Sequence, residues 1–290
     1  MVRMAKEMIK EPRYNGFFTI DVEDYYHILG VSGLPPIGEW DKIDSRVEIG
    51  MNRYFELLER KNIRATLFFL GYIASRNPQL VRRAIELGHE IASHGMYHQE
   101  IRGRDHKAFH DDATNSKKLL EDICGKDVKG WRSPGFSIGW STPWFFDTLI
   151  EAGYKYDSSI MPIRRSHKGL FENSLKPGFV NTGSGKIFEF PISVVEIGKL
   201  RISMFGGGYL RFFPYSLISI MKYRVLRDYP LTIYVHPREM DPDHPRISMN
   251  LFRKFKSYVN MESVKAKLEL LLDATDYQTF GDYYDTLGSH

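Results

Sequence analysis

The chain has 290 residues, of which 42% are hydrophobic and 26% charged, and its formal net charge at pH 7 is +4. These values are ordinary for a soluble globular protein, and the length suits one large α/β domain or two small ones. The single cysteine, Cys124, excludes an intramolecular disulfide and a cysteine-rich metal site. The lysines and arginines are dispersed, so we expect no nucleic-acid partner.

The N-terminal residues predict neither an export signal nor a membrane anchor. Residues 1–16, MVRMAKEMIKEPRYNG, lack the apolar core of a secretory signal. No apolar run approaches the roughly 18 residues that a transmembrane helix needs. We therefore expect a cytoplasmic protein without a transmembrane segment, and the sequence does not indicate an oligomeric state.

Strands and helices alternate along the first 160 residues. Short apolar runs rich in β-forming residues predict strands at 16–21, 65–71, 89–94, 128–132 and 154–159. Apolar residues at helical spacing predict helices at 44–63, 77–88, 104–125 and 141–153. We expect Asp44 or Ser45 to cap the first of these helices and Asn77 to cap the second.

The alternation thins between residues 160 and 212, where an irregular insertion with strand segments at 188–203 is expected. Helices at 214–228, 251–259 and 263–273 and a strand at 231–237 follow. Repeated strand–helix units predict parallel strands joined by helical crossovers. No linker or repeat divides the chain, so a single α/β domain over 1–290 is the simplest interpretation. A closed barrel is favoured over an open doubly wound sheet.

Two pairs of histidines share a spacing of four residues. His94 and His98 follow a predicted strand, whereas His106 and His110 lie inside a predicted amphipathic helix. Because parallel α/β folds bind ligands at the carboxyl ends of their strands, the first pair is the better candidate for metal ligation. We expect the second pair to lie on the surface.

Other polar side chains also follow predicted strands. They are Asp21, Glu23 and Asp24 after the first strand, Arg132 and Asp157 after the fourth and fifth, and His236 after the strand at 231–237. Placing polar groups at the ends of several apolar strands is costly unless they converge on a solvent-filled site. We therefore expect these residues to form one site.

The residue types in this set suit metal-assisted hydrolysis of an acyl bond. Two neutral imidazoles and one carboxylate hold a divalent metal while leaving positions open for water and substrate. A metal held in this way lowers the pKa of bound water and polarises a carbonyl oxygen. A second carboxylate can accept the proton of the water, and a separate histidine can protonate the leaving group.

Five short motifs in order resemble those of the polysaccharide deacetylases, the NodB-homology enzymes of carbohydrate esterase family 4. They are TIDVEDYYH, SHGMYH, RSPGFS, YDSS and YVHPREMDPDHPR, and GGGYLRFFPY is similar to the branch associated with exopolysaccharide gene clusters. The resemblance extends from about residue 16 to about residue 285. It implies a distorted (β/α) barrel with fewer than eight parallel strands.

The resemblance also implies roles for individual residues. Asp21 matches the catalytic base, Arg132 the residue that orients this base, and His236 the catalytic acid. His94 and His98 match the metal histidines. Asp157 is expected either to support His236 or to be a buried turn residue.

The first motif departs from the family pattern, because Val22 and Glu23 separate Asp21 from Asp24 where the family has two adjacent aspartates. We favour Asp24 as the metal carboxylate, with Glu23 as the alternative. Glu23 shares a face with Asp21 if the strand continues, and Asp24 is better placed if the chain turns after Val22. A site that neither carboxylate reaches would be metal-free.

The implied activity is metal-dependent removal of an N-acetyl group from a sugar of a polysaccharide or glycan precursor, with release of acetate. Zn²⁺ is the expected metal, and Co²⁺, Ni²⁺ or Fe²⁺ suits the same ligands. The expected partner is an N-acetylated carbohydrate. Two alternatives are a metal-independent, allantoinase-like hydrolase of a small cyclic amide or ureide, and a catalytically inactive glycan-binding protein.

Overall fold

The structure is a computed structural model, which describes residues 15–31, 33–139, 141–163 and 175–288. Its strands are β1 (Gly16–Val22), β2 (Thr66–Phe69), β3 (Glu90–Ser93), β4 (Gly130–Trp131), β5 (Tyr156–Asp157), β6 (Gly178–Thr182), β7 (Gly185–Glu189), β8 (Val195–Ile197), β9 (Leu200–Ile202), β10 (Leu231–Val235) and β11 (Tyr277–Gln278).

The α-helices are α2 (Val47–Lys61), α3 (Gly71–Arg76), α4 (Pro78–Glu86), α5 (His106–Cys124), α6 (Phe145–Glu151), α7 (Gly207–Phe212), α8 (Tyr215–Leu226), α9 (Leu251–Tyr258), α10 (Val264–Leu271) and α11 (Phe280–Leu287). Short 3₁₀ helices are η1 (Tyr25–His27), η2 (Ile37–Lys42), η3 (Pro134–Phe136), η4 (Pro237–Met240) and η5 (Met261–Ser263). Every helix expected from the sequence is present, and α3, α7 and α11 are additional helices that the periodicity did not predict.

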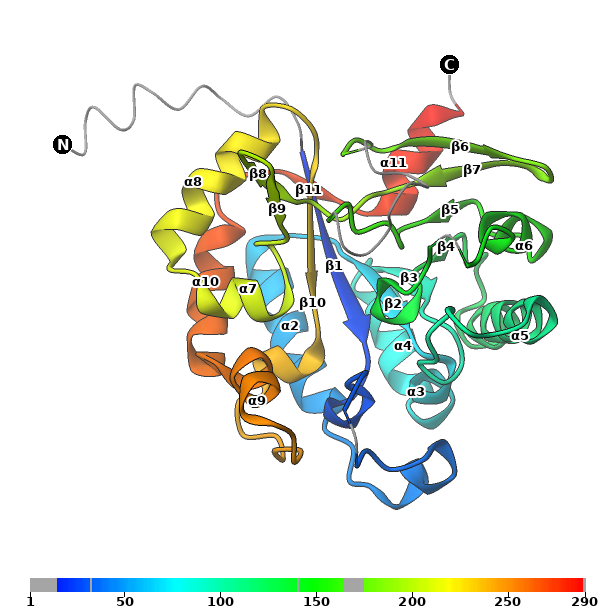
Figure 1. The fold of residues 1–290 in the computed structure, drawn as a ribbon, viewed down its shortest axis with the longest axis horizontal. Coiled ribbons are helices and arrows are strands. Elements are labelled where there is room, and N and C mark those ends of the chain that lie inside the picture. Colours follow the sequence, from blue (N-terminus) through cyan, green and yellow to red (C-terminus); the bar gives the residue numbers. More distant parts are fainter. Residues whose placement is uncertain (1–14, 32, 140, 164–174, 289–290) are drawn as a thin grey trace.

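One curled sheet organises the fold, with strand order β10-β1-β2-β3-β4-β5-β7-β6 and β11 paired to β1. All neighbours from β10 to β7 run parallel, and β6 pairs antiparallel with β7. Helices lie along the outside of the sheet (Figure 1). Within the described residues β6 does not pair with β10, so the sheet is a half-barrel. The predicted distorted (β/α) barrel is confirmed, whereas the prediction that the barrel is closed is wrong.

The two faces of the sheet bury different side chains, because neighbouring residues of a strand point in opposite directions. On β1, the residues packed in the large core beneath the helices are Phe18, Ile20 and Val22. The alternate residue Phe17 belongs to an aromatic cluster with Phe190 and Phe280. Phe190 and Phe280 stack with ring centroids 4.1 Å apart, so α11 packs against this aromatic cluster. The side chains of Thr19 and Asp21 lie on the same face of the sheet as Phe17, closer to the carboxyl end of β1.

The helix caps differ from the prediction. Arg46 stands at the cap position of α2 and its own side chain makes no capping bond, so neither Asp44 nor Ser45 has the expected role. Asn77 stands at the cap position of α4 but makes no capping bond, because its side-chain amide donates to the carbonyl of Ile73 at 3.1 Å. Neither helix therefore has a capping bond from the side chain of its own N-cap residue.

The described part of the segment expected to be an irregular insertion contributes to the main sheet, and residues 164–174 of that segment lie outside the described residues. Its hairpin β6–β7 extends the sheet beyond β5. The strands β8 and β9 form a separate two-stranded sheet, and Gly206 then pairs with Tyr234 of β10. Both ends of the chain add strands to the same sheet through β1 and β11. The assignment of residues 1–290 to a single domain stays a prediction.

None of the helices in the described ranges combines the length and the apolar composition that crossing a bilayer requires.

Candidate active site

Six strand-end residues meet at the carboxyl end of the sheet. Buried side chains there are Asp21, Glu23, His94, His98 and Arg132, and His236 keeps 14% of its side chain exposed. They come from β1, β3, β4 and β10, which are neighbours in the sheet or separated by one strand, and from the loops that follow. The convergence follows from the parallel topology, because parallel strands deliver their carboxyl ends to one edge.

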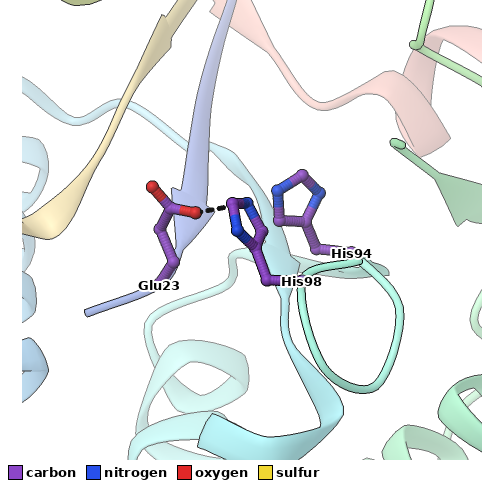
Figure 2. Close-up of side chains that lie close together, drawn as sticks. All are labelled: Glu23, His94 and His98. Carbon is purple, nitrogen blue, oxygen red and sulfur yellow. Dashed lines mark ion pairs between the residues drawn. The ribbon is translucent and has the colours of Figure 1, made fainter. Parts of the chain in front are cut away.

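Glu23, His94 and His98 form the one cluster in the described residues with the ligand types and spacing of a metal site (Figure 2). One potential ligand atom from each residue lies within 4.8 Å of the others. His98 Nε2 and Glu23 Oε2 are 2.5 Å apart. Burial alone would raise the pKa of Glu23, but the charge and hydrogen bond of His98, with the charge of His236, lower it strongly. Glu23 is therefore an anion at neutral pH.

The donor set fits a divalent metal. His94 Nδ1 lies 2.8 Å from the carbonyl oxygen of Arg132 and must donate to it, so the lone pair of Nε2 is free for a ligand. Burial lowers the pKa of His94 to about 4, which keeps the ring neutral. Neutral imidazoles and a carboxylate are the ligands of catalytic zinc sites.

Asp24 does not belong to this cluster. Its carboxylate caps η1 through the backbone N–H of Tyr25 at 2.8 Å, and it accepts bonds from Ser45 Oγ at 2.5 Å and from the N–H of Arg46 at 3.0 Å. These contacts join the loop after β1 to the start of α2. The structure thus places the favoured carboxylate, Asp24, in a structural role and the alternative, Glu23, beside the imidazoles.

His27 is a buried residue near the site that sequence reasoning missed. Its Nδ1 accepts the N–H of Asp24 at 2.9 Å, and its ring centroid lies 6.0 Å from that of His98. Burial lowers the pKa of His27 to about 3, so it packs as a neutral ring behind the cluster. Its position in the motif DVEDYYH is the signal that could have singled it out.

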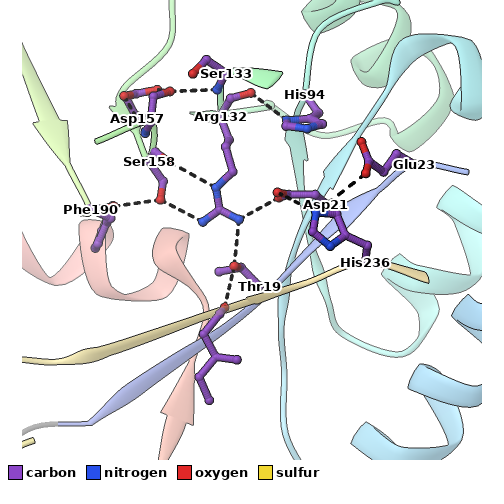
Figure 3. Close-up of polar contacts among 12 residues, drawn as sticks. Thr19, Asp21, Glu23, His94, Arg132, Ser133, Asp157, Ser158, Phe190 and His236 are labelled. Carbon is purple, nitrogen blue, oxygen red and sulfur yellow. Dashed lines mark hydrogen bonds and ion pairs between the residues drawn. The ribbon is translucent and has the colours of Figure 1, made fainter. Parts of the chain in front are cut away.

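Asp21 is held by a buried arginine (Figure 3). Arg132 Nη1 donates to Asp21 Oδ1 at 2.7 Å and to Thr19 Oγ1 at 2.8 Å, and the other guanidinium nitrogens bond Ser158. The guanidinium also lies over the ring of Phe68, 4.1 Å from its centroid. Together these contacts fix the plane of the Arg132 guanidinium. Oδ1 of Asp21 is therefore held in place, and Oδ2 faces His236.

His236 faces two carboxylates of the site with one nitrogen and a third carboxylate with the other. Its Nε2 lies 4.0 Å from Asp21 Oδ2 and 3.7 Å from Glu23 Oε1, and its Nδ1 lies 3.6 Å from Glu239 Oε1. Burial opposes protonation, but Glu239 and the charge of Glu23 outweigh it and raise the pKa of His236. Glu239 is itself paired with buried Arg211.

Glu239 therefore supports His236, which was one of the two roles predicted for Asp157. The structure does not bring Asp157 to His236. Its carboxylate accepts the N–H and O–H of Ser159, at 2.9 and 2.7 Å, and Ser159 Oγ accepts the N–H of Ser133. Burial raises the pKa of Asp157 to about 6. Asp157 is a buried turn residue that positions the segment after Arg132.

The signal for Glu239 was its place three residues after His236 in the run HPRE, where a 3₁₀ turn brings the two together. Sequence spacing alone did not separate this carboxylate from the neighbouring Asp241, which pairs with Arg46 at 2.6 Å.

The second histidine pair lies away from the site. His106 begins α5 and is exposed, and its ring stacks on Trp144 at 5.4 Å. His110 is half-buried on the same helix, beside Asp111. The expectation of surface histidines agrees with this placement.

The fold and the cluster define a class of α/β half-barrel with a candidate metal centre at its carboxyl edge. Comparison with known proteins agrees with this class. Residues 41–156 match the polysaccharide deacetylase family, and residues 158–285 match a domain of unknown function (DUF3473). The resemblance to polysaccharide deacetylases that the motifs predict is therefore confirmed. The first match contains His94, His98 and Arg132, while Asp21 and Glu23 precede it.

A peptidoglycan-N-acetylglucosamine deacetylase of Bacillus cereus is 33% identical over 100 residues, which are 34% of this chain and 45% of that protein. The chain spans less than half the length of the curated relatives that it matches.

Two solved structures share the fold. A probable polysaccharide deacetylase of Pseudomonas aeruginosa has a TM-score of 0.61 at 17% identity, over 96% of this chain and 92% of that one. An allantoinase has a TM-score of 0.61 at 15% identity, over 96% and 91%. At these identities the likeness shows the fold and does not separate the two activities.

Proposed function

We propose that this protein is a metal-dependent hydrolase that removes the N-acetyl group from a sugar of a polysaccharide or glycan precursor. The observation that carries the proposal is the buried Glu23–His94–His98 cluster beside the Asp21–Arg132 pair. The family match over residues 41–156 and the name of the Bacillus cereus relative support the substrate class. A cytoplasmic location stays a prediction from the sequence.

Glu23, His94 and His98 would hold the metal, and Zn²⁺ suits this ligand set, with Co²⁺, Ni²⁺ and Fe²⁺ as alternatives. When bound, such a metal supplies Lewis acidity toward the acetamide oxygen and lowers the pKa of water. The carbonyl of Arg132 fixes the tautomer of His94, which keeps its free nitrogen pointed at the site.

Asp21 is the proposed base. Arg132 holds Oδ1, so Oδ2 is left to accept a proton from the attacking water as the new C–O bond forms. Arg132 also supplies the positive charge that faces this buried carboxylate.

His236 is the proposed acid. It gives a proton to the sugar nitrogen as the C–N bond breaks, so the products are acetate and a free amine. The Glu239 carboxylate beside Nδ1 favours the protonated form that this step needs.

The test is acetate release from N-acetylglucosamine oligomers by the purified chain, before and after treatment with a chelator and after return of Zn²⁺. We expect activity to be lost with the chelator and restored with the metal. His94→Ala should abolish both bound metal and turnover, and the matched variant His106→Ala should change neither. Asp21→Asn should abolish turnover and leave the bound metal in place.

A folded, metal-loaded protein that releases no acetate from any N-acetylated sugar would contradict the proposal. Turnover of a cyclic ureide that is insensitive to the chelator would favour the metal-independent alternative. Binding of glycans without turnover would favour the inactive binding protein.

A further inference from the structure

A second surface of the molecule carries exposed aromatic side chains that the proposed chemistry does not use. Helix α9 buries only Ser257. Leu251, Phe252 and Phe255 are exposed to 86%, 79% and 54%. Exposed contiguous apolar groups of this kind mark interaction surfaces in soluble proteins.

The apolar residues of α9 form one stripe. At about 100° per residue, Leu251, Phe255 and Phe252 fall within about 100° of one another on the helix, and Ser257 lies on the opposite side. Exposed Lys256 and Lys254 flank the stripe on its two sides. In a helix that packs on a core the apolar face is buried, whereas in α9 the apolar face is exposed to solvent.

Helix α7 extends the same surface. Phe212 and Tyr209 are exposed, and the ring centroid of Phe212 lies 6.0 Å from that of Phe255. These residues line a groove with Phe252 and Lys256, with little polar surface inside it. We call the set Tyr209, Phe212, Leu251, Phe252, Phe255, Lys254 and Lys256 the α9 surface.

The charged residues of α9 all have one sign. Residues 250–259, NLFRKFKSYV, contain three basic residues and no acidic one. Lysine is depleted from the cores of protein–protein interfaces, whereas aromatic and leucine side chains flanked by lysine and arginine are typical of helices that lie in an anionic membrane surface. Charge complementarity therefore favours an anionic lipid bilayer over a protein partner.

The α9 surface is connected to the proposed active site. Arg253 of α9 donates to the carbonyl of Leu29, two residues after η1. The ring centroid of Tyr258, at the end of α9, lies 5.8 Å from that of His244. The His244 centroid in turn lies 5.8 Å from that of Tyr25. Figure 1 shows α9 on the side of the molecule toward which β1 points. A surface docked through α9 would thus lie on the side where the site residues converge.

We propose that the α9 surface docks the protein on anionic lipid bilayers, with Leu251, Phe252 and Phe255 inserted at the level of the headgroups and Lys254 and Lys256 paired with lipid phosphates. This inference is independent of the proposed deacetylase activity, since it stands on a different set of residues.

The test is co-sedimentation of the full chain with vesicles of phosphatidylcholine alone and of phosphatidylcholine with phosphatidylglycerol. We expect binding to the anionic vesicles that falls as salt rises, and little binding to the neutral ones. The double variant Lys254→Gln/Lys256→Gln should bind about 30-fold more weakly, since each basic residue near an anionic surface contributes about 1 kcal/mol. Phe252→Ser/Phe255→Ser should abolish binding.

The matched control is Ile197→Ser/Leu200→Ser in the β8–β9 hairpin, where the two side chains are exposed to 51% and 59%. This variant should bind vesicles as the unaltered chain does. Because all the substituted residues are exposed, thermal unfolding should not move, and circular dichroism checks this.

Equal binding to neutral and anionic vesicles, or undiminished binding of the Phe252→Ser/Phe255→Ser variant, would overturn the proposal. A concentration-dependent dimer that the same variant abolishes, with no vesicle binding, would assign the surface to a second copy of the chain. Acetate release from soluble oligomers is measured in parallel and should be unchanged in both α9 variants. Loss of vesicle binding with retained acetate release thus rejects only the docking surface.

Discussion

The identity of the metal carboxylate is the sharpest point on which the structure can be tested. Glu23 and Asp24 are adjacent in sequence and both are buried, but only Glu23 lies with His94 and His98. Replacing each by its amide keeps the size of the side chain and removes its charge. The pair Glu23→Gln and Asp24→Asn therefore separates the two assignments with minimal disturbance.

The two variants should fail in different ways. Glu23→Gln removes one of three proposed ligands, and loss of a group that merely supports a ligand already costs 10–100-fold in affinity, so we expect the metal Kd to rise by more than about 100-fold, or about 2.7 kcal/mol. Asp24→Asn leaves the metal Kd unchanged. It weakens the contacts of Asp24 with Tyr25, Ser45 and Arg46, so the free energy of unfolding should fall by about 1–2 kcal/mol.

The metal Kd is measured by competition with a chromogenic chelator, and the free energy of unfolding by urea titration of the metal-free protein. The reasoning is refuted if Asp24→Asn weakens metal binding as much as Glu23→Gln does, or if Glu23→Gln binds Zn²⁺ with the original affinity.

Three further outcomes follow from buried charges and rings. Arg132→Met leaves Asp21 buried without a counter-ion, so urea titration should show a loss of about 3–5 kcal/mol; a smaller loss would mean that water reaches the pair. His236→Gln should lower kcat by about 10²–10⁴-fold in the acetate assay with the metal still bound, and unchanged kcat would exclude it as the acid. Burial lowers the pKa of His89 to about 4, and its Nδ1 accepts the N–H of Ala65 at 3.2 Å. The unfolded ring binds a proton at higher pH than the folded one, so stability should fall by about 2 kcal/mol from pH 7 to pH 5, and this part of the slope should vanish in His89→Asn.

The sequence by itself determined the alternation of most strands and helices over the first 160 residues and the candidates for most residues at the site. Apolar runs and helical spacing are local signals, and α2, α4, α5 and α8 appear where those signals predicted them. Because parallel strands have their carboxyl ends at one edge of a sheet, the sequence alone also predicted that Asp21, His94 and His236 lie in one site. The same rule distinguished His94 and His98 from the pair on α5.

Tertiary structure decided which neighbouring carboxylate takes which role. Strand β1 ends at Val22, and the N–H of Glu23 then bonds the carbonyl of Asp21 at 3.0 Å, so Glu23 turns into the site although the strand has ended. Asp24 is drawn to the start of α2, a contact between segments about 20 residues apart that no local pattern reveals. In the same way a 3₁₀ turn selects Glu239 to face His236.

The missing closure of the barrel and the exposed face of α9 are also products of packing. A sequence pattern states which side of a helix is apolar, but it does not state whether another element covers that side. In α9 the described structure leaves the apolar side uncovered, with Leu251 and Phe252 in solvent. Side-chain direction and burial depend on contacts between distant segments, and these exist only once the chain has folded.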